Sequence, residues 1–409
     1  MSRTTRTRPT RRGALAATAG LALLTTACGQ AGTDAGSAGA TAEPSGGHGY
    51  VAGAEELTEP QLRLSYLDGA GATHSLDLLT GESIALDPIG ATTSVVSDGR
   101  FLFAVSEAGE LTVVDSGTWT VDHGDHAHYY RAQPRVVGTL DWSGEVRVGS
   151  SEQTTTLFSP ATGEGLVLDR AALGQGEIEQ TASTEAAPHD GALLPLGQHL
   201  VATDADQVRA LDADGEPVDG ASAPCPDARG GASTRVGVVV SCADGAVQAT
   251  EADGGVEFEA VPYPEPVAEE QRATAFAQRP GRPSVAAVAG DRGVWVLDTR
   301  ARSWQLIETP APLARAVAVD DDRDRVVALD DAGRLLVIEP EAGVVATTEP
   351  LAGAPEDLAA MTLEVDASRA YVNVPSAGVV HEVDYADGAR LARSLPTEVT
   401  PLFFAETGR

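Results

Sequence analysis

Lysine is absent from this 409-residue chain, so all 28 of its basic residues are arginine, and asparagine occurs once, at Asn373. The 60 acidic residues give a formal net charge of −32. Nucleic-acid backbones bind to basic faces, so this balance argues against nucleic acid as a partner. Without lysine the chain also cannot complete a GxxxxGK[ST] phosphate-binding loop. The bias toward Arg, Ala and Gly is typical of a GC-rich bacterial genome.

Aromatic residues are also scarce, at 4%, and only three cysteines are present. Hydrophobic residues nevertheless make up 42% of the chain, which is enough to fill a sizeable core of Val, Leu and Ala. The sequence contains no G-x-S-x-G, HExxH or CxxC motif. Because nucleophilic and zincin-type catalysis have no motif in this chain, we expect a protein that is not an enzyme.

The N-terminus has the order of a bacterial export signal. Five arginines precede an apolar stretch at residues 14–24, and Thr-Thr-Ala-Cys then ends at Cys28. The stretch is too short for a stable membrane span, so residues 1–27 are predicted to be a signal peptide. The small residues before Cys28 resemble a lipobox and predict its lipidation, with an uncleaved anchor or ordinary secretion as alternatives. Residues 28–56, rich in Gly, Ala, Ser and Thr, are predicted to be a flexible tether.

The two other cysteines, Cys225 and Cys242, form an even pair. A lipid-anchored protein lies on the outer face of the cytoplasmic membrane, where disulfides persist, so this pair is predicted to be bonded. A bridge that closes a loop of this size is worth about 3 kcal/mol in the chain-entropy model. We expect a monomer that contacts the membrane through its lipid anchor alone.

The remaining residues, 57–409, repeat one short phrase and are predicted to form a single domain. Each copy is a strand of alternating apolar residues, then an acidic or small residue, then a turn that contains Gly. The copies recur about every 44 residues, the length of one four-stranded propeller blade. They align on Asp77, Asp115, Ser159, Asp212, Glu251, Asp298, Glu339 and Asp384.

These copies predict an all-β fold, a β-propeller of eight blades, with seven blades as the alternative. The first unit lacks an innermost strand, whereas a spare strand follows the last unit at Pro401–Glu406. We expect this C-terminal strand to complete the first blade, because closing the ring removes the exposed edges of an open array.

Three unusual segments fall between predicted blades, at residues 121–130, 188–191 and 224–233. The connections between successive blades lie on one face of a propeller, beside the central channel. We therefore expect all three segments on that face, with the Cys225–Cys242 bridge bracing it.

Two of these segments carry side chains suited to a metal ion. Neutral imidazole binds Zn, Cu, Ni and Fe, and a carboxylate adds charge neutralisation. Gly124 allows the first segment to bend so that its histidines converge, and the alternative is an exposed loop that binds metal only adventitiously. His48 on the tether is a candidate mobile auxiliary ligand. The predicted ligands are His123, His126, His128 and His189, followed by Asp125 and Asp190.

HGDHAHYYRAQPRVVG, APHDGALLPLGQHL, CP…SCADG and VHEVDYADGARLARSL…AETGR occur in this order. From about residue 60 onward the chain thereby resembles the AztD-type zinc metallochaperones, extracytoplasmic propellers that serve zinc ABC transporters. The string HGDHAHYY is the most specific element. The resemblance implies a protein that stores Zn²⁺ and delivers it, by direct contact, to the substrate-binding lipoprotein of such a transporter.

Two positions depart from the pattern of that family. Asp190 stands where the family has a histidine, and Asp227-Ala228-Arg229-Gly230 replaces Leu-His-Gly-Glu. Aspartate binds zinc, so the first change can conserve a ligand, whereas a ligand contributed by the second segment is either missing or replaced by Asp190 or Asp227. Two other classes stay open. One is a metal-dependent propeller hydrolase of the lactonase type, which needs an open metal position beside an apolar pocket; the other is a metal-free interaction scaffold.

Overall fold

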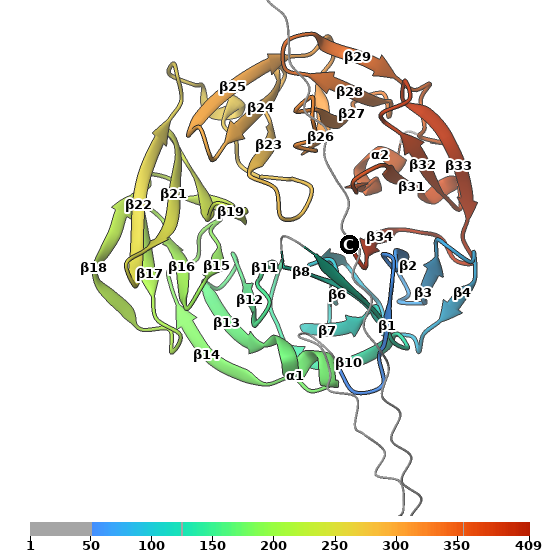
Figure 1. The fold of residues 1–409 in the computed structure, drawn as a ribbon, viewed down its shortest axis with the longest axis horizontal. Helices are drawn as coiled ribbons and strands as arrows, with labels where there is room; N and C mark the ends of the chain where they lie inside the picture. The colour runs from blue at the N-terminus through green and yellow to red at the C-terminus, as the bar shows by residue number, and fades with distance from the viewer. Residues whose placement is uncertain (1–50, 124–125, 355) are drawn as a thin grey trace, which may run out of the picture. The chain divides into compact units, whose positions relative to one another are not determined.

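The computed structural model describes residues 51–123, 126–354 and 356–409, which form antiparallel sheets arranged around a ring (Figure 1). The middle strands are buried on both faces, as in β6 (Phe101–Val105) and β27 (Val326–Asp330), because each sheet packs against a neighbour on either side. This arrangement confirms the predicted all-β propeller class. Within the described ranges, no helix is long and apolar enough to cross a membrane.

Among the described residues, eight sheets follow one another around the ring, and the strands of each sheet are named from the innermost outward. The first four contain, in turn, β34 (Phe403–Thr407), β2 (Arg63–Leu67), β3 (Thr73–Asp77) and β4 (Ser83–Ala85); β5 (Ser94–Ser97), β6, β7 (Glu110–Asp115) and β10 (Arg135–Asp141); β11 (Arg147–Ser150), β12 (Thr154–Phe158), β13 (Glu164–Asp169) and β14 (Gln180–Glu185); and β15 (Leu193–Leu196), β16 (His199–Asp204), β17 (Gln207–Leu211) and β18 (Pro217–Pro224).

The other four sheets continue the same order. They contain β19 (Arg229–Ser233), β20 (Val238–Cys242), β21 (Gly245–Ala252) and β22 (Gly255–Pro262); β23 (Ser284–Val288), β24 (Gly293–Asp298) and β25 (Ser303–Glu308); β26 (Leu313–Ala318), β27, β28 (Leu335–Glu339) and β29 (Gly343–Thr347); and β30 (Leu363–Val365), β31 (Ala370–Val374), β32 (Val379–Asp384) and β33 (Arg390–Pro396). The short helices are α1 (Arg170–Gln175), η1 (Glu269–Gln271), α2 (Asp357–Ala360) and η2 (Pro375–Ala377).

The C-terminal strand closes the ring as predicted. β34 pairs antiparallel with β2, from Arg63 opposite Thr407 to Leu67 opposite Phe403. Phe404 of this strand is 4% exposed and packs between the first and last sheets. The two ends of the propeller are therefore held together by backbone hydrogen bonds and by apolar burial.

Two of the predicted repeats differ in detail from the structure. Ser159 follows the second strand of its four-stranded sheet, whereas in the other four-stranded sheets the aligned residue lies at or beside the end of the third strand, so this copy lies one strand earlier in its sheet than the alignment predicts. The sixth sheet has three strands, and an isolated bridge between Ala277 and Ala286 joins the chain at its inner edge. Both differences arise because alternation marks a strand without marking which neighbour it pairs with.

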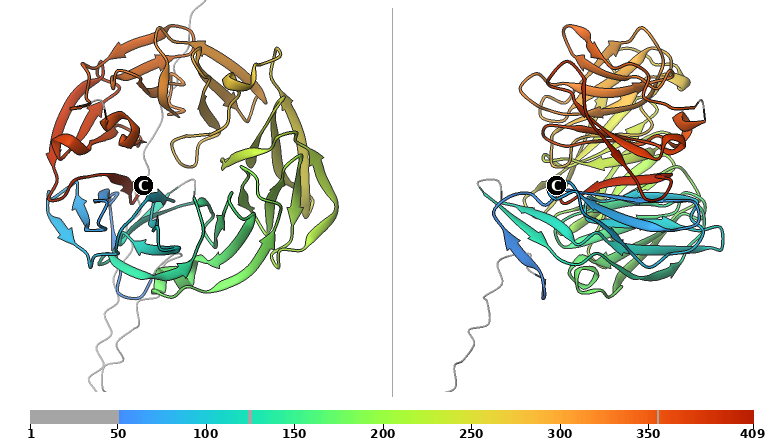
Figure 2. Two further views of the ribbon diagram at one scale, coloured as in Figure 1. Left: turned by 180° about the vertical axis from the view of Figure 1, so that it is seen from behind. Right: turned by 90° about the vertical axis from the view of Figure 1, so that its right-hand side faces the viewer.

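A hairpin is inserted into the second sheet, and it corrects the predicted position of the first unusual segment. β8 (Thr118–Asp122) and β9 (Ala127–Arg131) lie between β7 and β10, so the hairpin joins the third and fourth strands of one sheet. Turns of an antiparallel sheet alternate between its two ends. The hairpin therefore lies on the face opposite to the connections between sheets. Figure 2 agrees, because its edge-on view has the hairpin and α2, which lies in such a connection, on opposite sides.

A third strand joins this hairpin. β1 (Glu55–Leu57) pairs antiparallel with β9, giving a small sheet in the order β1-β9-β8. The register places Glu56 opposite Tyr130. Glu55 and Glu56 thus belong to a strand, two residues ahead of the predicted start of the folded domain at residue 57. This small sheet positions the candidate site.

The closing strand carries a carboxyl group with no exposed surface, Glu406. Burial raises the pKa of Glu406 well above its usual range; Arg409 opposes this shift, and the negative charges of Asp366 and Glu364 add to it. The folded state therefore binds the proton more tightly than the unfolded chain. This contribution to stability is fully present below the unfolded pKa and is lost as the pH rises through the folded pKa.

Replacing Glu406 by Gln should therefore reduce the loss of stability between pH 5 and pH 9. Gln stays neutral at both pH values, so the folded state no longer has to bury a charge at pH 9. The measurement is the free energy of unfolding in urea at both pH values, with Glu308→Gln, at a position where the side chain is 72% exposed, as the matched control. An equal fall with pH in the wild type and in Glu406→Gln would contradict this prediction.

Candidate metal centre

The base of the hairpin is a close approach of two backbone segments. The chain enters through Gly117, whose carbonyl accepts a hydrogen bond of 2.6 Å from the amide of Ala132 where the chain leaves. Gly117 has a φ of +74°, and a Cβ atom there would lie 2.5 Å from the carbonyl oxygen of Ala132. A glycine is therefore required at this point for the hairpin to leave and rejoin the sheet.

Aromatic packing fixes the hairpin to the second sheet. The rings of Trp119 and Tyr130 stack with centroids 5.2 Å apart, and the Arg100 guanidinium carbon lies 3.7 Å from the Trp119 ring centroid. Asp115 accepts two hydrogen bonds from Arg100, of 3.1 and 2.9 Å, so this buried cation is also paired. A desolvated cation–π contact is worth about 2 kcal/mol. The hairpin therefore has a rigid base, while its tip extends beyond these contacts.

Three histidines gather at the tip of the hairpin. His123 follows β8, His126 precedes β9 and His128 lies within β9. One ring nitrogen from each lies within 4.8 Å of the others, and the ring centroids are 5.0 to 5.3 Å apart. A backbone hydrogen bond of 2.9 Å from the His123 amide to the His126 carbonyl closes the turn. The predicted convergence of these three side chains is thus present in the fold.

The spacing of these nitrogens fits a metal ion after a small contraction. Zinc–nitrogen bonds of about 2.0–2.1 Å in a tetrahedron place neighbouring ligands about 3.3–3.4 Å apart. His123 and His126 are exposed and His128 is partly buried, so the rings can close around an ion without disturbing the core. Three imidazoles suit zinc and leave a fourth position open. Elsewhere in the described part of the chain, no other group of three His, Cys, Asp or Glu side chains comes this close together.

A carboxylate from outside the hairpin touches this cluster. Glu56 Oε1 in β1 lies 2.6 Å from Nδ1 of His128. The ring of Tyr130 stacks on that of His128 at a centroid distance of 6.3 Å. Burial raises the pKa of Tyr130, and the charge of Glu56 adds to this shift. Glu56 was not among the predicted ligands, and nothing in its local sequence distinguishes it from the other acidic residues near it.

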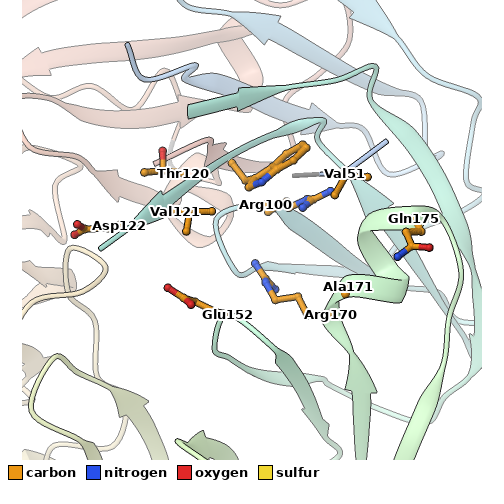
Figure 3. A pocket seen from close by; sticks show the side chains of 10 residues that line it. Val51, Arg100, Thr120, Val121, Asp122, Glu152, Arg170, Ala171 and Gln175 are labelled. Carbon is orange, nitrogen blue, oxygen red and sulfur yellow. The ribbon is translucent and has the colours of Figure 1, made fainter. Parts of the chain in front are cut away.

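A pocket of about 450 Å³ lies beside the base of the hairpin (Figure 3). Arg100 and Arg170 both line it, and they pair with Asp115 and Asp98, respectively. Both arginines of the lining are therefore already paired with carboxylates. Its residues are Val51, Arg100, Trp119, Thr120, Val121, Asp122, Glu152, Arg170, Ala171 and Gln175.

The structure does not bring His189 and Asp190 to the histidine cluster. They lie in the connection from β14 to β15, on the opposite face from the hairpin. The ring nitrogens of His189 contact the Ala187 carbonyl and the Thr203 hydroxyl, each at 2.8 Å, and Asp190 pairs with Arg147. The expectation that all the unusual segments share one face is therefore wrong for the hairpin.

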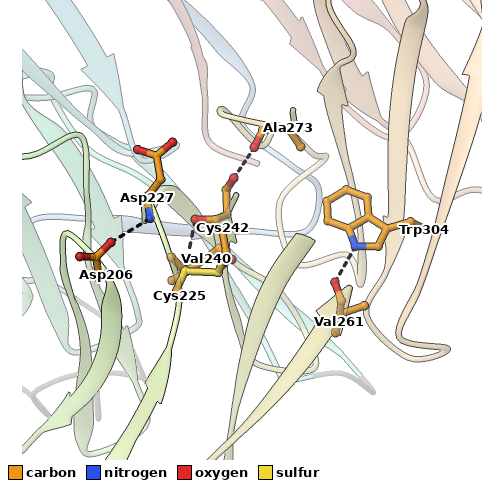
Figure 4. The surroundings of a disulfide bond; sticks show 9 residues. Asp206, Cys225, Asp227, Val240, Cys242, Val261, Ala273 and Trp304 are labelled. Atoms are coloured by element: carbon orange, nitrogen blue, oxygen red, sulfur yellow. Dashed lines mark hydrogen bonds between the residues drawn. A yellow bond between two sulfur atoms is a disulfide. The ribbon is translucent and has the colours of Figure 1, made fainter. Parts of the chain in front are cut away.

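The predicted disulfide between Cys225 and Cys242 is present, with Cα atoms 5.0 Å apart (Figure 4). Cys225 begins the connection from β18 to β19 and Cys242 ends β20, so the bridge braces the face that carries His189. Nearby, Asp227 pairs with Arg229 at 3.0 Å and with Arg272 at 3.4 Å. On this face, the carboxylates of Asp190 and Asp227 are therefore both paired with arginine.

Three of the predicted positions, Cys28, His48 and Asp125, lie outside the described residues, as does the signal peptide. The remaining histidines, His74, His199 and His381, lie in β3, β16 and β32, within sheets of the propeller. Burial lowers the pKa of His381.

No protein-family model matches the chain. Solved structures with the same fold include apo AztD from Citrobacter koseri, with a TM-score of 0.72 and 19% identity over 86% of this chain and 98% of that chain. A crystal structure of Citrobacter koseri AztD has a TM-score of 0.71, with 20% identity over 86% of this chain and 99% of that chain. Dihydro-heme d1 dehydrogenase NirN in complex with DHE has a TM-score of 0.52, with 16% identity over 85% and 75%. The AztD-type propeller fold expected from the motifs is thereby confirmed, and at these identities the likeness concerns the fold alone.

Proposed function

We propose that this chain is an extracytoplasmic zinc carrier, in which His123, His126 and His128 hold Zn²⁺ for delivery to the substrate-binding lipoprotein of a zinc ABC transporter. The protein acts as a metallochaperone and not as an enzyme. The observation that carries the proposal is the convergence of three imidazoles at the tip of a hairpin that stands outside the blades.

The exposure of the cluster favours transfer over a structural role. A structural zinc site has four protein ligands in a closed tetrahedron, whereas the described residues of this hairpin offer three imidazoles and leave a fourth position for another ligand. A ligand from an acceptor protein can enter at that position before the carrier releases the ion. Because the tip has exposed histidines, an acceptor can reach the ion by direct contact.

Two independent features support the proposed compartment. A disulfide persists in an oxidising environment, which supports a location outside the cytoplasm. The N-terminal sequence supports export and lipidation at Cys28, which would hold the carrier at the membrane where the transporter works. The acidic surface then serves solubility and enriches cations only weakly.

Zinc binding itself is tested by offering the purified wild-type protein equal amounts of Zn²⁺, Ni²⁺ and Co²⁺, followed by gel filtration and elemental analysis. We expect one zinc retained per chain. Retention of no metal would overturn the proposal and favour the metal-free scaffold.

A further inference from the structure

Glu56 reaches the histidine cluster from a segment outside the blades. Its strand, β1, has three residues and pairs with β9. The adjacent Glu55 pairs with Arg131, with 3.1 Å between Oε2 and Nη2, whereas Glu56 contacts His128. Two neighbouring carboxylates on one short strand thus have separate partners, and only one of these partners belongs to the candidate site.

The contact fixes which nitrogen of His128 can bind a metal. An ionised carboxylate only accepts hydrogen bonds, so the 2.6 Å contact requires the proton of His128 to be on Nδ1. The lone pair of the neutral ring is then on Nε2. In metal sites, a carboxylate often accepts a hydrogen bond from the ring nitrogen of a histidine ligand that does not bind the metal. Such a carboxylate also fixes the orientation of the ring and makes it a more basic ligand.

We propose that Glu56 is a positioning residue, which sets the tautomer and orientation of His128 and thereby couples the pairing of β1 to the zinc affinity of the hairpin. The inference rests on the proposed function. Coupling between two events is reciprocal, so β1 strengthens zinc binding and bound zinc strengthens the pairing of β1 with β9. The affinity of the site is therefore set partly by a strand that the propeller itself does not contain.

The first test is the zinc affinity of Glu56→Ala and Glu56→Gln, measured by competition with a chromophoric chelator. Loss of an outer carboxylate from a histidine ligand costs roughly 10- to 100-fold in metal affinity. We expect a loss in this range for Ala and a smaller loss for Gln, whose amide oxygen still accepts a hydrogen bond from Nδ1. Glu55→Ala is the matched control and should lose much less zinc affinity than Glu56→Ala, because it removes an exposed ion pair between β1 and β9 but no contact with the cluster.

The second test uses readouts that general destabilisation would not move. With Co²⁺ bound, Glu56→Ala should show its visible absorption bands at the same wavelengths as the wild type, because Glu56 is not a ligand. A higher Co²⁺ concentration should be needed to saturate the site of this variant. In amide hydrogen exchange, Zn²⁺ should slow exchange in β1 of the wild type and of Glu55→Ala, and this effect should be lost in Glu56→Ala.

The outcomes separate this inference from the proposed function. If the wild type binds zinc and the zinc affinity of Glu56→Ala is within twofold of the wild-type value, the positioning role of Glu56 is overturned and the proposed function stands. Shifted Co²⁺ bands in Glu56→Ala would overturn the positioning role by making Glu56 a ligand. Failure of the wild type to bind zinc would remove the proposed function and this inference with it.

Discussion

A protein that carries both His126→Ala and His128→Ala is expected to lose its bound zinc and to keep its fold. Two of the three imidazoles that converge within 4.8 Å are removed, and one histidine cannot hold the ion tightly. Loss of a mere outer partner costs roughly 10- to 100-fold in affinity, so losing two ligands should cost more than about 100-fold. Elemental analysis and chelator competition measure the loss, and circular dichroism reports the fold.

The matched control is the double variant His199→Ala, His381→Ala. These histidines lie in β16 and β32, away from the hairpin, so their replacement should leave zinc binding unchanged. Unchanged zinc stoichiometry in the His126→Ala, His128→Ala protein would contradict the assignment of the site. An equal loss of zinc affinity in both double variants would contradict the assignment as well, because the hairpin histidines would then matter no more than histidines elsewhere in the propeller.

Removal of residues 402–409 is expected to prevent formation of a stable ring. The deletion takes away β34, so β2 loses one of its two antiparallel partners along the whole of Arg63–Leu67 and keeps only β3. Buried Phe404 is lost as well, and replacing a buried Phe by Ala alone typically costs about 3–5 kcal/mol. Such a loss approaches the whole stability of about 5–15 kcal/mol of an ordinary domain. Thermal unfolding and size-exclusion chromatography should show a non-cooperative, aggregating protein.

Single substitutions in β34 should cause smaller losses of stability than the deletion. Phe404→Ala should lower the free energy of unfolding by about 3–5 kcal/mol, and Phe403→Ala by less, because Phe403 is only partly buried. A truncated chain that melts cooperatively near the wild-type temperature would contradict the closure seen between β34 and β2.

The propeller could be predicted because the sequence signals of its strands and turns lie within each repeat. Each blade strand alternates apolar residues and ends at a turn with Gly or Asp, so strands and their spacing are visible one repeat at a time. The closing role of β34 followed from a missing strand at the start and a spare strand at the end. The Cys225–Cys242 bridge followed from a count of cysteines in an exported chain.

The placement of the hairpin could not be predicted in the same way. β8, β9 and β10 all have the composition of blade strands, and the spacing of the repeats is the same whether β10 ends one sheet or begins the next. Pairing between distant strands decides the matter, and the face of the propeller on which the histidines lie depends on it. His189 was therefore grouped with His123 although the fold separates them.

Glu56 was missed for a related reason. A strand of three residues has no detectable alternation, and β1 exists because β9 offers it an edge. The composition before residue 57 is that of a tether, which hides a strand whose stability comes from tertiary contact.

The single asparagine of the chain has a structural role. Asn373 donates hydrogen bonds to the carbonyls of Ala360 and Pro401 and accepts one from the amide of Thr362.

The central claim is that the hairpin hands its zinc to an acceptor by direct contact. The most direct measurement is stopped-flow transfer from the zinc-loaded protein to a purified substrate-binding protein of a zinc ABC transporter, with a small chelator of similar affinity as the control donor. We expect the transfer rate to rise with acceptor concentration and to exceed the rate of spontaneous zinc release from the hairpin. A rate that is independent of acceptor concentration and equal to spontaneous release would contradict the claim.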